Sequence, residues 1–229
     1  MNRFDIISLA AASLISLADT SSPNEALSAA QPVLEAFSAA VLACDRTPPF
    51  QPSLSISSAA GATRYDASTR TIVVVSYDGL DPNRRAAMER FAAIGTLGLS
   101  GRAQYVEVFN GLLVAHELGH WVQDVSRRPL NRWQAESEAN RMMVAFWREH
   151  PSAISTDLRL ANFVAQGPQA PDAMHRDAGT SAEDFFNTNL ARIEADPMQY
   201  ALFQKAMVRT AMAETPQPTF CEAIRQAWP

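Results

Sequence analysis

The chain has 229 residues, of which 47% are hydrophobic and 19% are charged. This length and composition fit one globular domain with a sizeable core, and the chain shows neither an internal repeat nor a low-complexity linker. The net charge is −5 and the basic residues form no run, so the sequence lacks the basic patch of a nucleic-acid-binding protein.

The first twenty residues resemble a targeting signal. Arg3 precedes an apolar run from Ile6 to Ala18 that ends in small residues, which is the order typical of a secretory signal peptide. Asp5 favours the alternative, an apolar first helix, because this region of a signal peptide is normally positive. The run is too short to span a membrane stably. We therefore expect residues 1–20 to be the signal peptide of a protein exported to the periplasm or the extracellular space, with a cytoplasmic location as the alternative.

Helical signals begin directly after this segment. Ser22-Pro23-Asn24-Glu25 has the cap, the first-turn proline and the glutamate of a helix N-terminus. Apolar residues then recur at helical spacing, namely Leu27, Leu34, Phe37 and Val41. Pro32 predicts a kink within this first helix.

Three short extended segments follow the prolines at 48 and 49. They are Leu54–Ser57, Ala62–Asp66 and the β-branched run Thr71–Tyr77. Residues 66–69 have the composition of a turn between the last two segments. We therefore predict a small antiparallel sheet of two or three strands.

From Asp81 onward the pattern is helical. We predict helices over residues 82–97, 103–125, 132–149, 156–167 and 197–213, and shorter ones after Ser181 and Thr219. Residues 167–180 form a polar loop. The whole of 21–229 is therefore expected to be one mainly helical α+β domain.

The helix predicted over residues 103–125 contains His116-Glu117-Leu118-Gly119-His120, an H-E-x-x-H motif. Positions four apart on a helix share one face, so both imidazoles can reach one metal ion. Glu117 is turned by about 100° around the axis, where it can hold a metal-bound water. The alternative is a pair of ordinary core histidines. The apolar surroundings favour a metal, because it satisfies two buried imidazoles at once.

Two histidines are one protein ligand short of the usual catalytic zinc site. The next predicted helix offers Glu136 and Glu138. On a helical projection, Glu136 lies within the apolar arc of that helix, whereas Glu138 lies on the opposite, polar side. A carboxylate on an apolar face is costly unless it meets a cation. Glu136 is therefore predicted as the third ligand in preference to Glu138.

Three nearby residues have alternative interpretations. Asn140 can accept a hydrogen bond from a zinc-bound histidine or cap a neighbouring helix. Glycine inside a helix lowers stability, so Gly119 needs a reason. Another backbone or the substrate can approach closely at this position, or the glycine can serve a packing contact alone. Asp124 can orient the site or pair with Arg127.

The motif, followed by Glu136-Ser137-Glu138-Ala139-Asn140, resembles the zincin metallopeptidases. It is most similar to the gluzincin type, in which a glutamate on a following helix is the third ligand, and the resemblance covers residues 112–147. It departs from that type at Asn140, where an acidic residue is frequent, and in the short linker between His120 and Glu136. Gln123 and Ser126 stand where the metzincin pattern needs a glycine and a histidine.

This resemblance implies a fold, a cofactor and a reaction. The domain would be zincin-like, with one Zn2+ held by His116, His120 and Glu136 and with Glu117 as the general base in hydrolysis of a peptide or protein substrate. The strand over Thr71–Ser76 would be the sheet edge that aligns an extended peptide.

The predicted function is therefore that of an exported zinc metallopeptidase. His175 and Tyr200 are the candidate donors to the oxyanion. One alternative is a zinc-bearing module that binds a partner without cleaving it, against which the intact Glu117 argues. The other is a helical protein in which the motif is accidental.

The two cysteines, Cys44 and Cys221, lie near opposite ends of the mature chain. In an exported protein they can pair and join the two ends. In a cytosolic protein they would be buried thiols.

Overall fold

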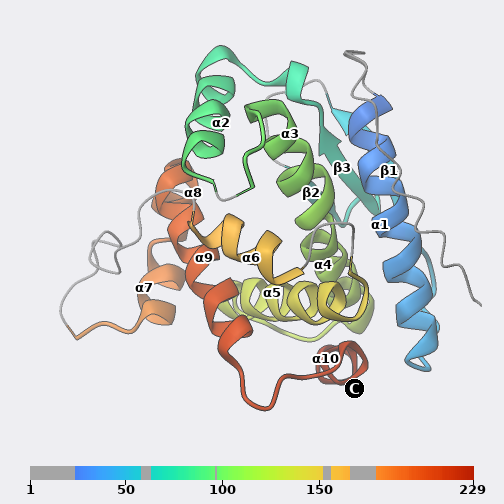
Figure 1. Cartoon of the computed structure of the whole chain (residues 1–229). Helices are drawn as coiled ribbons and strands as arrows, with labels where there is room; N and C mark the ends of the chain where they lie inside the picture. Colours follow the sequence, from blue (N-terminus) through green and yellow to red (C-terminus); the bar gives the residue numbers. More distant parts are fainter. Residues whose placement is uncertain (1–23, 58–62, 96, 152–155, 166–178) are drawn as a thin grey trace, which may run out of the picture.

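The computed structural model describes residues 24–57, 63–95, 97–151, 156–165 and 179–229. The predicted signal peptide and His175 therefore lie outside the described residues. The sheet lies toward one side of the molecule, beside α1 (Figure 1). The elements follow one another in the order α1 (Asn24–Ala43), β1 (Ser53–Ser57), β2 (Arg64–Asp66), β3 (Thr71–Val75), α2 (Pro82–Ile94), α3 (Gly101–Tyr105), a π-helical segment (Val106–Leu112), α4 (Val114–Ser126), α5 (Arg132–Glu149), α6 (Thr156–Ala165), α7 (Ala182–Thr188), α8 (Leu190–Ala195), α9 (Pro197–Ala213) and α10 (Phe220–Ala227). The predicted mainly helical α+β class is confirmed.

The sheet is mixed, with the strand order β1-β3-β2. The turn at 66–69 makes β2 and β3 an antiparallel pair, as predicted, and Asp66 accepts hydrogen bonds from Ser68 and Thr69 within it. The prediction for β1 is wrong, because β1 pairs with the other side of β3 and runs parallel to it. Strand direction depends on how the chain returns to the sheet, which alternation within one strand does not encode.

The strand predicted as the substrate-aligning edge is instead the middle of the sheet. All five residues of β3 are buried, and the strand pairs with β1 along its whole length and with β2 over Thr71–Val73. This expectation from the resemblance is therefore wrong. The edge that faces the metal-motif helix α4 belongs to β2.

The helix predicted over residues 103–125 consists of three pieces. α3 leads into the π-helical segment, in which Leu113 N donates to Val108 O, five residues back, at 2.8 Å. The carbonyl of Leu112 accepts a hydrogen bond from the indole nitrogen of Trp147 at 3.0 Å. The bulge thus has its own hydrogen-bond partner on α5, and α4 begins directly after it with the motif.

The main core holds α4 and α5 against α1 and α10. At its centre lie the buried rings of Phe37, Trp121, Phe146 and Phe220. Burial of apolar area of this kind is the main source of folding free energy, at about 25 cal/mol per Å². The helices that carry the motif and Glu136 are therefore anchored in the main core.

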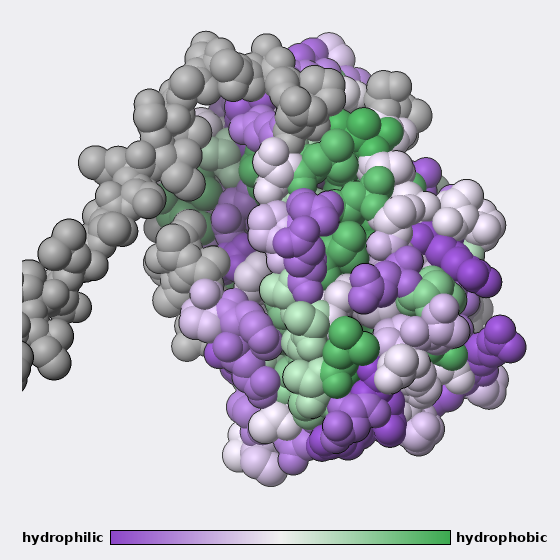
Figure 2. All heavy atoms as spheres, turned by 90° about the vertical axis from the view of Figure 1, so that its right-hand side faces the viewer, coloured by the Kyte–Doolittle hydropathy of each residue, from purple (hydrophilic) through white to green (hydrophobic). Residues whose placement is uncertain are grey.

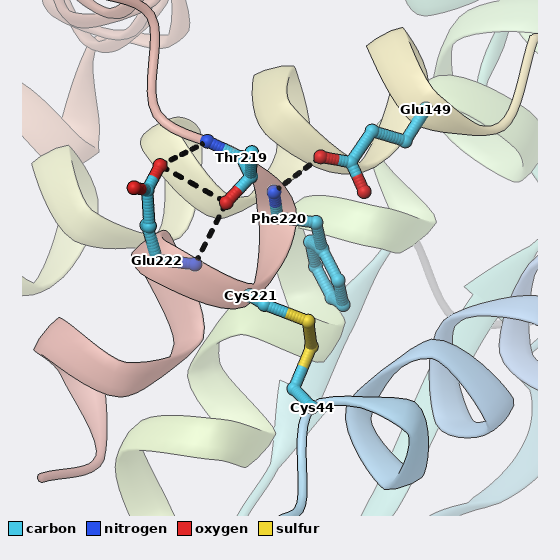
Figure 3. Close-up of a disulfide and its surroundings, with 6 residues drawn as sticks. All are labelled: Cys44, Glu149, Thr219, Phe220, Cys221 and Glu222. Atoms are coloured by element: carbon cyan, nitrogen blue, oxygen red, sulfur yellow. Dashed lines mark hydrogen bonds between the residues drawn. A yellow bond between two sulfur atoms is a disulfide. The ribbon is translucent and has the colours of Figure 1, made fainter.

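A disulfide joins the two ends of the described chain. Cys44 follows α1, Cys221 lies in the first turn of α10, and the structure bonds their sulfurs (Figure 3). Beside the disulfide, Thr219 and Glu222 form a capping box, and Phe220 N donates to Glu149 at 2.8 Å. The predicted pairing of the cysteines is present in this structure.

A second, smaller core lies among α7, α8 and α9. Its buried apolar residues are Phe185, Phe186, Ile193, Leu202, Phe203 and Met207, and Trp133 of α5 packs against them. The Trp133 ring meets Phe186 and Phe203 edge to face, at centroid distances of 5.7 and 6.3 Å. This cluster fixes α9 against the beginning of α5.

Helix α1 lies on one side of the molecule. Within the described part of the chain, Glu25–Ala43 is long and apolar enough to cross a membrane by length and composition alone. Its fully buried residues Phe37 and Val41 belong to the main core, so the apolar sequence has a structural role in the fold. On this face, Figure 2 shows a band of hydrophobic side chains beside hydrophilic ones. A shallow, open depression here is lined by Leu27, Ser28, Gln31, Pro32 and Leu54.

Candidate metal centre

Helix α4 places His116 and His120 one turn apart on the face directed toward α5. Their rings meet edge to face, with centroids 4.8 Å apart and an angle of 88° between the planes. His116 is buried, and the side chain of His120 is 17% exposed. The predicted common face of the two imidazoles is therefore present, at the boundary between the core and solvent.

Helix α5 brings Glu136 to these histidines. Its Oε2 lies 3.2 Å from Nε2 of His116 and 3.6 Å from Nε2 of His120. One potential ligand atom from each of the three residues falls within 4.8 Å of the others, so the group can hold a metal ion. Glu136 is fully buried, as its place in the apolar arc predicts. Glu138 is directed elsewhere and pairs with Arg128 at 3.1 Å.

The close approach of α4 and α5 depends on Gly119. A Cβ at this position would lie 2.8 Å from Cα and 3.1 Å from Cβ of Ala139. Real Cβ atoms essentially never approach a backbone atom so closely, so the site requires glycine. Of the predicted reasons for Gly119, the approach of another backbone is the one that the structure shows. Ala139 lies three residues after Glu136, so this contact also sets the distance between the two ligand-bearing helices.

The charges at the centre favour an ionised Glu136. Burial alone raises the pKa of this carboxyl, but hydrogen bonds with His116 and His120 outweigh burial and hold the pKa far below its usual range. Burial likewise opposes the charged form of His120, and Glu136 overcomes it and raises the pKa of His120 to about 8. Arg132 lies 3.1 Å from Glu136 Oε1, in an ion pair that lacks hydrogen-bond alignment. The site thus holds one buried anion facing cationic groups, an arrangement that also suits a metal cation.

Gln123 determines which nitrogen of His120 faces Glu136. Its Nε2 donates to the carbonyl of Ala135 at 2.8 Å, which turns its Oε1 toward Nδ1 of His120, at 2.9 Å. Because that oxygen can only accept, Nδ1 carries the proton in the neutral imidazole and Nε2 keeps a lone pair for a metal. Nδ1 of His116 is buried and has no hydrogen-bond partner among the described residues.

Glu117 is held by the edge of the sheet rather than by the histidine cluster. The backbone N–H of Tyr65 in β2 donates to Glu117 Oε2 at 2.8 Å. The hydroxyl of the same tyrosine donates to Asp124 Oδ2 at 2.7 Å. Of the two expectations for Asp124, pairing with Arg127 is not what the structure shows. Asp124 instead accepts from Tyr65, the residue whose N–H holds Glu117. Nothing in the short extended segment around Tyr65 indicates this role.

Helix α9 supplies a residue that the sequence interpretation missed. Gln204 Nε2 donates to Glu136 Oε2 at 2.7 Å, and Gln204 Oε1 accepts from Asn140 Nδ2 at the same distance. Asn140 was predicted to bond a histidine or to cap a helix. That prediction is wrong, because its amide donates to Gln204 instead. Gln204 lies among Phe203, Met207 and Val208, all buried, so a polar residue on an apolar helical face is the signal that identifies it.

Tyr200 lies one turn before Gln204 on α9. Burial raises the pKa of its hydroxyl, and the carboxylate charges of Glu136 and Glu117 raise it further. The hydroxyl therefore stays protonated and can act as a donor at neutral pH. The structure brings this candidate near the centre. His175, the other candidate, is outside the described residues.

Comparison of the chain with models of protein families, with characterised proteins and with solved structures finds no match. The function is therefore inferred from the chemistry of the group formed by His116, His120 and Glu136.

Proposed function

We propose that this chain is a zinc-dependent metallopeptidase in which His116, His120 and Glu136 hold one Zn2+ and Glu117 is the general base. The observation that carries the proposal is a single carboxylate oxygen that faces two imidazole nitrogens at 3.2 and 3.6 Å. Two imidazoles and a carboxylate are a common donor set of catalytic zinc, which leaves a further position open for water.

The burial of Glu136 and the tautomer of His120 both support a metal ion at this site. Glu136 has no exposed surface, and a buried carboxylate of this kind needs strong cationic partners. Gln123 leaves the lone pair of His120 on Nε2, the atom that faces Glu136. Zinc is favoured over magnesium or calcium because the latter two prefer sets made only of oxygen ligands.

When bound, zinc supplies a water of lowered pKa and polarises the carbonyl of the substrate. Glu117 accepts the proton of that water and later donates it to the leaving amine. The N–H of Tyr65 holds one oxygen of Glu117, which leaves the other oxygen for this transfer. Tyr200, whose hydroxyl stays protonated, donates to the oxygen of the carbonyl as charge develops there.

We also propose that the protein is exported. The disulfide between Cys44 and Cys221 supports this location, because such bonds persist in oxidising compartments and are rare in the cytosol. The order of charged and apolar residues in the first twenty positions supports it independently.

The test is cleavage of a peptide library by zinc-loaded wild-type protein and by Glu117→Gln. We expect the variant to keep one equivalent of zinc and to lose activity by at least about 100-fold, the lower end of what a positioned general base contributes. Equal cleavage by both proteins would remove Glu117 from the mechanism. A wild-type protein that binds zinc and cleaves no peptide would favour the alternative of a zinc-bearing binding module.

A further inference from the structure

The third ligand of the proposed centre is held from α9, a helix that contributes no ligand itself. Gln204 is largely buried, and its Nε2 donates to Glu136 Oε2 at 2.7 Å. This is the same oxygen that faces both histidines. Glu136 Oε1 instead faces Arg132. The two oxygens of the carboxylate therefore have separate partners.

Asn140 contacts the other end of the Gln204 amide. Its Nδ2 donates to Gln204 Oε1 at 2.7 Å, so the oxygen of Gln204 is directed away from Glu136 and the nitrogen toward it. With the amide turned over, an oxygen would face the carboxylate and an NH2 group would face the NH2 group of Asn140. Both contacts would be repulsive.

We propose that Gln204, oriented by Asn140, is a positioning residue for the metal ligand Glu136. One lone pair of Oε2 accepts the Gln204 N–H, and the other remains for the metal, which favours ligation through this single oxygen. This inference rests on the proposed zinc site, and it adds a residue that acts on the metal only through Glu136. Partners of this type typically contribute about 10–100-fold to metal affinity.

The arrangement also couples the metal to the packing of α9. Phe203 and Met207, on either side of Gln204, are buried in the second core with α7 and α8. Because Gln204 bonds Glu136 only when α9 is docked, zinc binding and docking of α9 stabilise each other by linkage. The residues that hold the metal thus extend into a region that lies outside the H-E-x-x-H helix and the glutamate helix.

The test measures zinc affinity by competition with a chromophoric chelator in wild type, Gln204→Leu, Asn140→Leu and the double variant. We expect Gln204→Leu to weaken zinc binding by about 10–100-fold and Asn140→Leu to weaken it less. The double variant should bind zinc no more weakly than Gln204→Leu, since Asn140 acts through Gln204. If the losses of zinc affinity in the two single variants added in full in the double variant, Asn140 would act independently of Gln204, and its orienting role would be overturned.

The matched control is Gln104→Leu, which removes a buried glutamine that accepts from Asn162 at 3.1 Å, away from the centre. This variant should lose stability but not zinc affinity. As a second measurement, zinc should slow amide exchange of residues 197–213 in wild type and much less in Gln204→Leu. If Gln204→Leu does not fold, Asn140→Leu with the exchange measurement carries the test, and unchanged affinity and exchange there would overturn the inference.

The two proposals fail in different ways. A folded Gln204→Leu whose zinc affinity is within twofold of wild type would overturn the positioning role and leave the zinc site intact. A wild-type protein without zinc affinity would overturn the proposed function, and this inference with it.

Discussion

The two sides of the candidate centre are built in different ways. On one side, α4 and α5 lie in the main core and touch backbone to backbone at Gly119 and Ala139, so the three potential ligands are set by packed helices. On the other side, α9 belongs to the second core and reaches the centre through Gln204. If the proposals hold, the positions of the three potential ligands depend on the close packing of α4 and α5, whereas the orientation of Glu136 depends on the neighbouring smaller core.

The largest expected effect concerns the α5 side. Glu136→Ala should weaken zinc affinity by more than the 100-fold upper range of an indirect partner, because it removes a ligand itself. Glu138→Ala is the matched control, since its carboxylate pairs with Arg128 and lies outside the cluster. The two affinities are measured by chelator competition, and comparable losses in both variants would contradict the choice of Glu136.

The contact between α4 and α5 gives the next effect. Gly119→Ala should destabilise the fold by about 1–3 kcal/mol, because the added methyl meets the backbone of Ala139. Gly111→Ala is the matched control, since its Cβ meets nothing closer than 3.4 Å. Chemical denaturation measures both free energies of unfolding. A Gly119→Ala protein as stable as wild type would show that the helices can separate without cost.

Helix α9 should also impose a pH dependence on stability. Lys205 is 5% exposed; burial and then the charge of Arg209 lower its pKa from 10.5 to about 8. Below pH 8 the folded protein keeps a buried cation, and between pH 8 and 10.5 only the unfolded chain binds the proton. The free energy of unfolding therefore rises with pH in this interval.

Lys205→Met removes this penalty. It should stabilise the protein by an amount on the order of 1–3 kcal/mol at pH 7, and the gain should shrink between pH 8 and 10.5. Denaturation curves across this pH range give the measurement. A gain that is constant with pH would mean that Lys205 is not a buried cation.

The smallest effect concerns the support of Glu117 by the sheet. Tyr65→Phe removes the hydrogen bond to Asp124 and keeps the backbone donor to Glu117, so we expect a loss of about 0.5–1.5 kcal/mol in stability. Peptide cleavage should fall several-fold while zinc affinity stays constant. Asp124→Ala, which removes the acceptor of the same hydrogen bond, should behave in the same way. A fall in zinc affinity for either variant would show that this contact also supports the metal ligands.

The α4–α5 side could be predicted because its signals are local. Four-residue spacing places His116 and His120 on one face, and a helical projection identifies Glu136 as buried. The same projection applied to residues 197–213 finds Gln204 as a polar residue between buried apolar neighbours. The projection gives no partner for it, since Gln204 and Glu136 are 68 residues apart.

Other features could not be read from local patterns. The parallel pairing of β1 depends on the path of the chain, and in the π-helical segment before α4 the carbonyl of Leu112 accepts from Trp147, 35 residues away. Tyr65 contributes its backbone N–H, a group that every residue except proline possesses, so its identity carries no signal. The sequence places Asn140 one turn after Glu136 on the same helix, but its partner Gln204 lies on α9, which packs in the second core.

We propose above that His116, His120 and Glu136 together hold one zinc ion. The zinc K-edge X-ray absorption spectrum of the protein loaded with one equivalent of metal tests this ligand set directly. We expect two imidazole ligands, with nitrogen and oxygen neighbours at about 2.0–2.2 Å. A shell made only of oxygen atoms, without imidazole scattering, would contradict it.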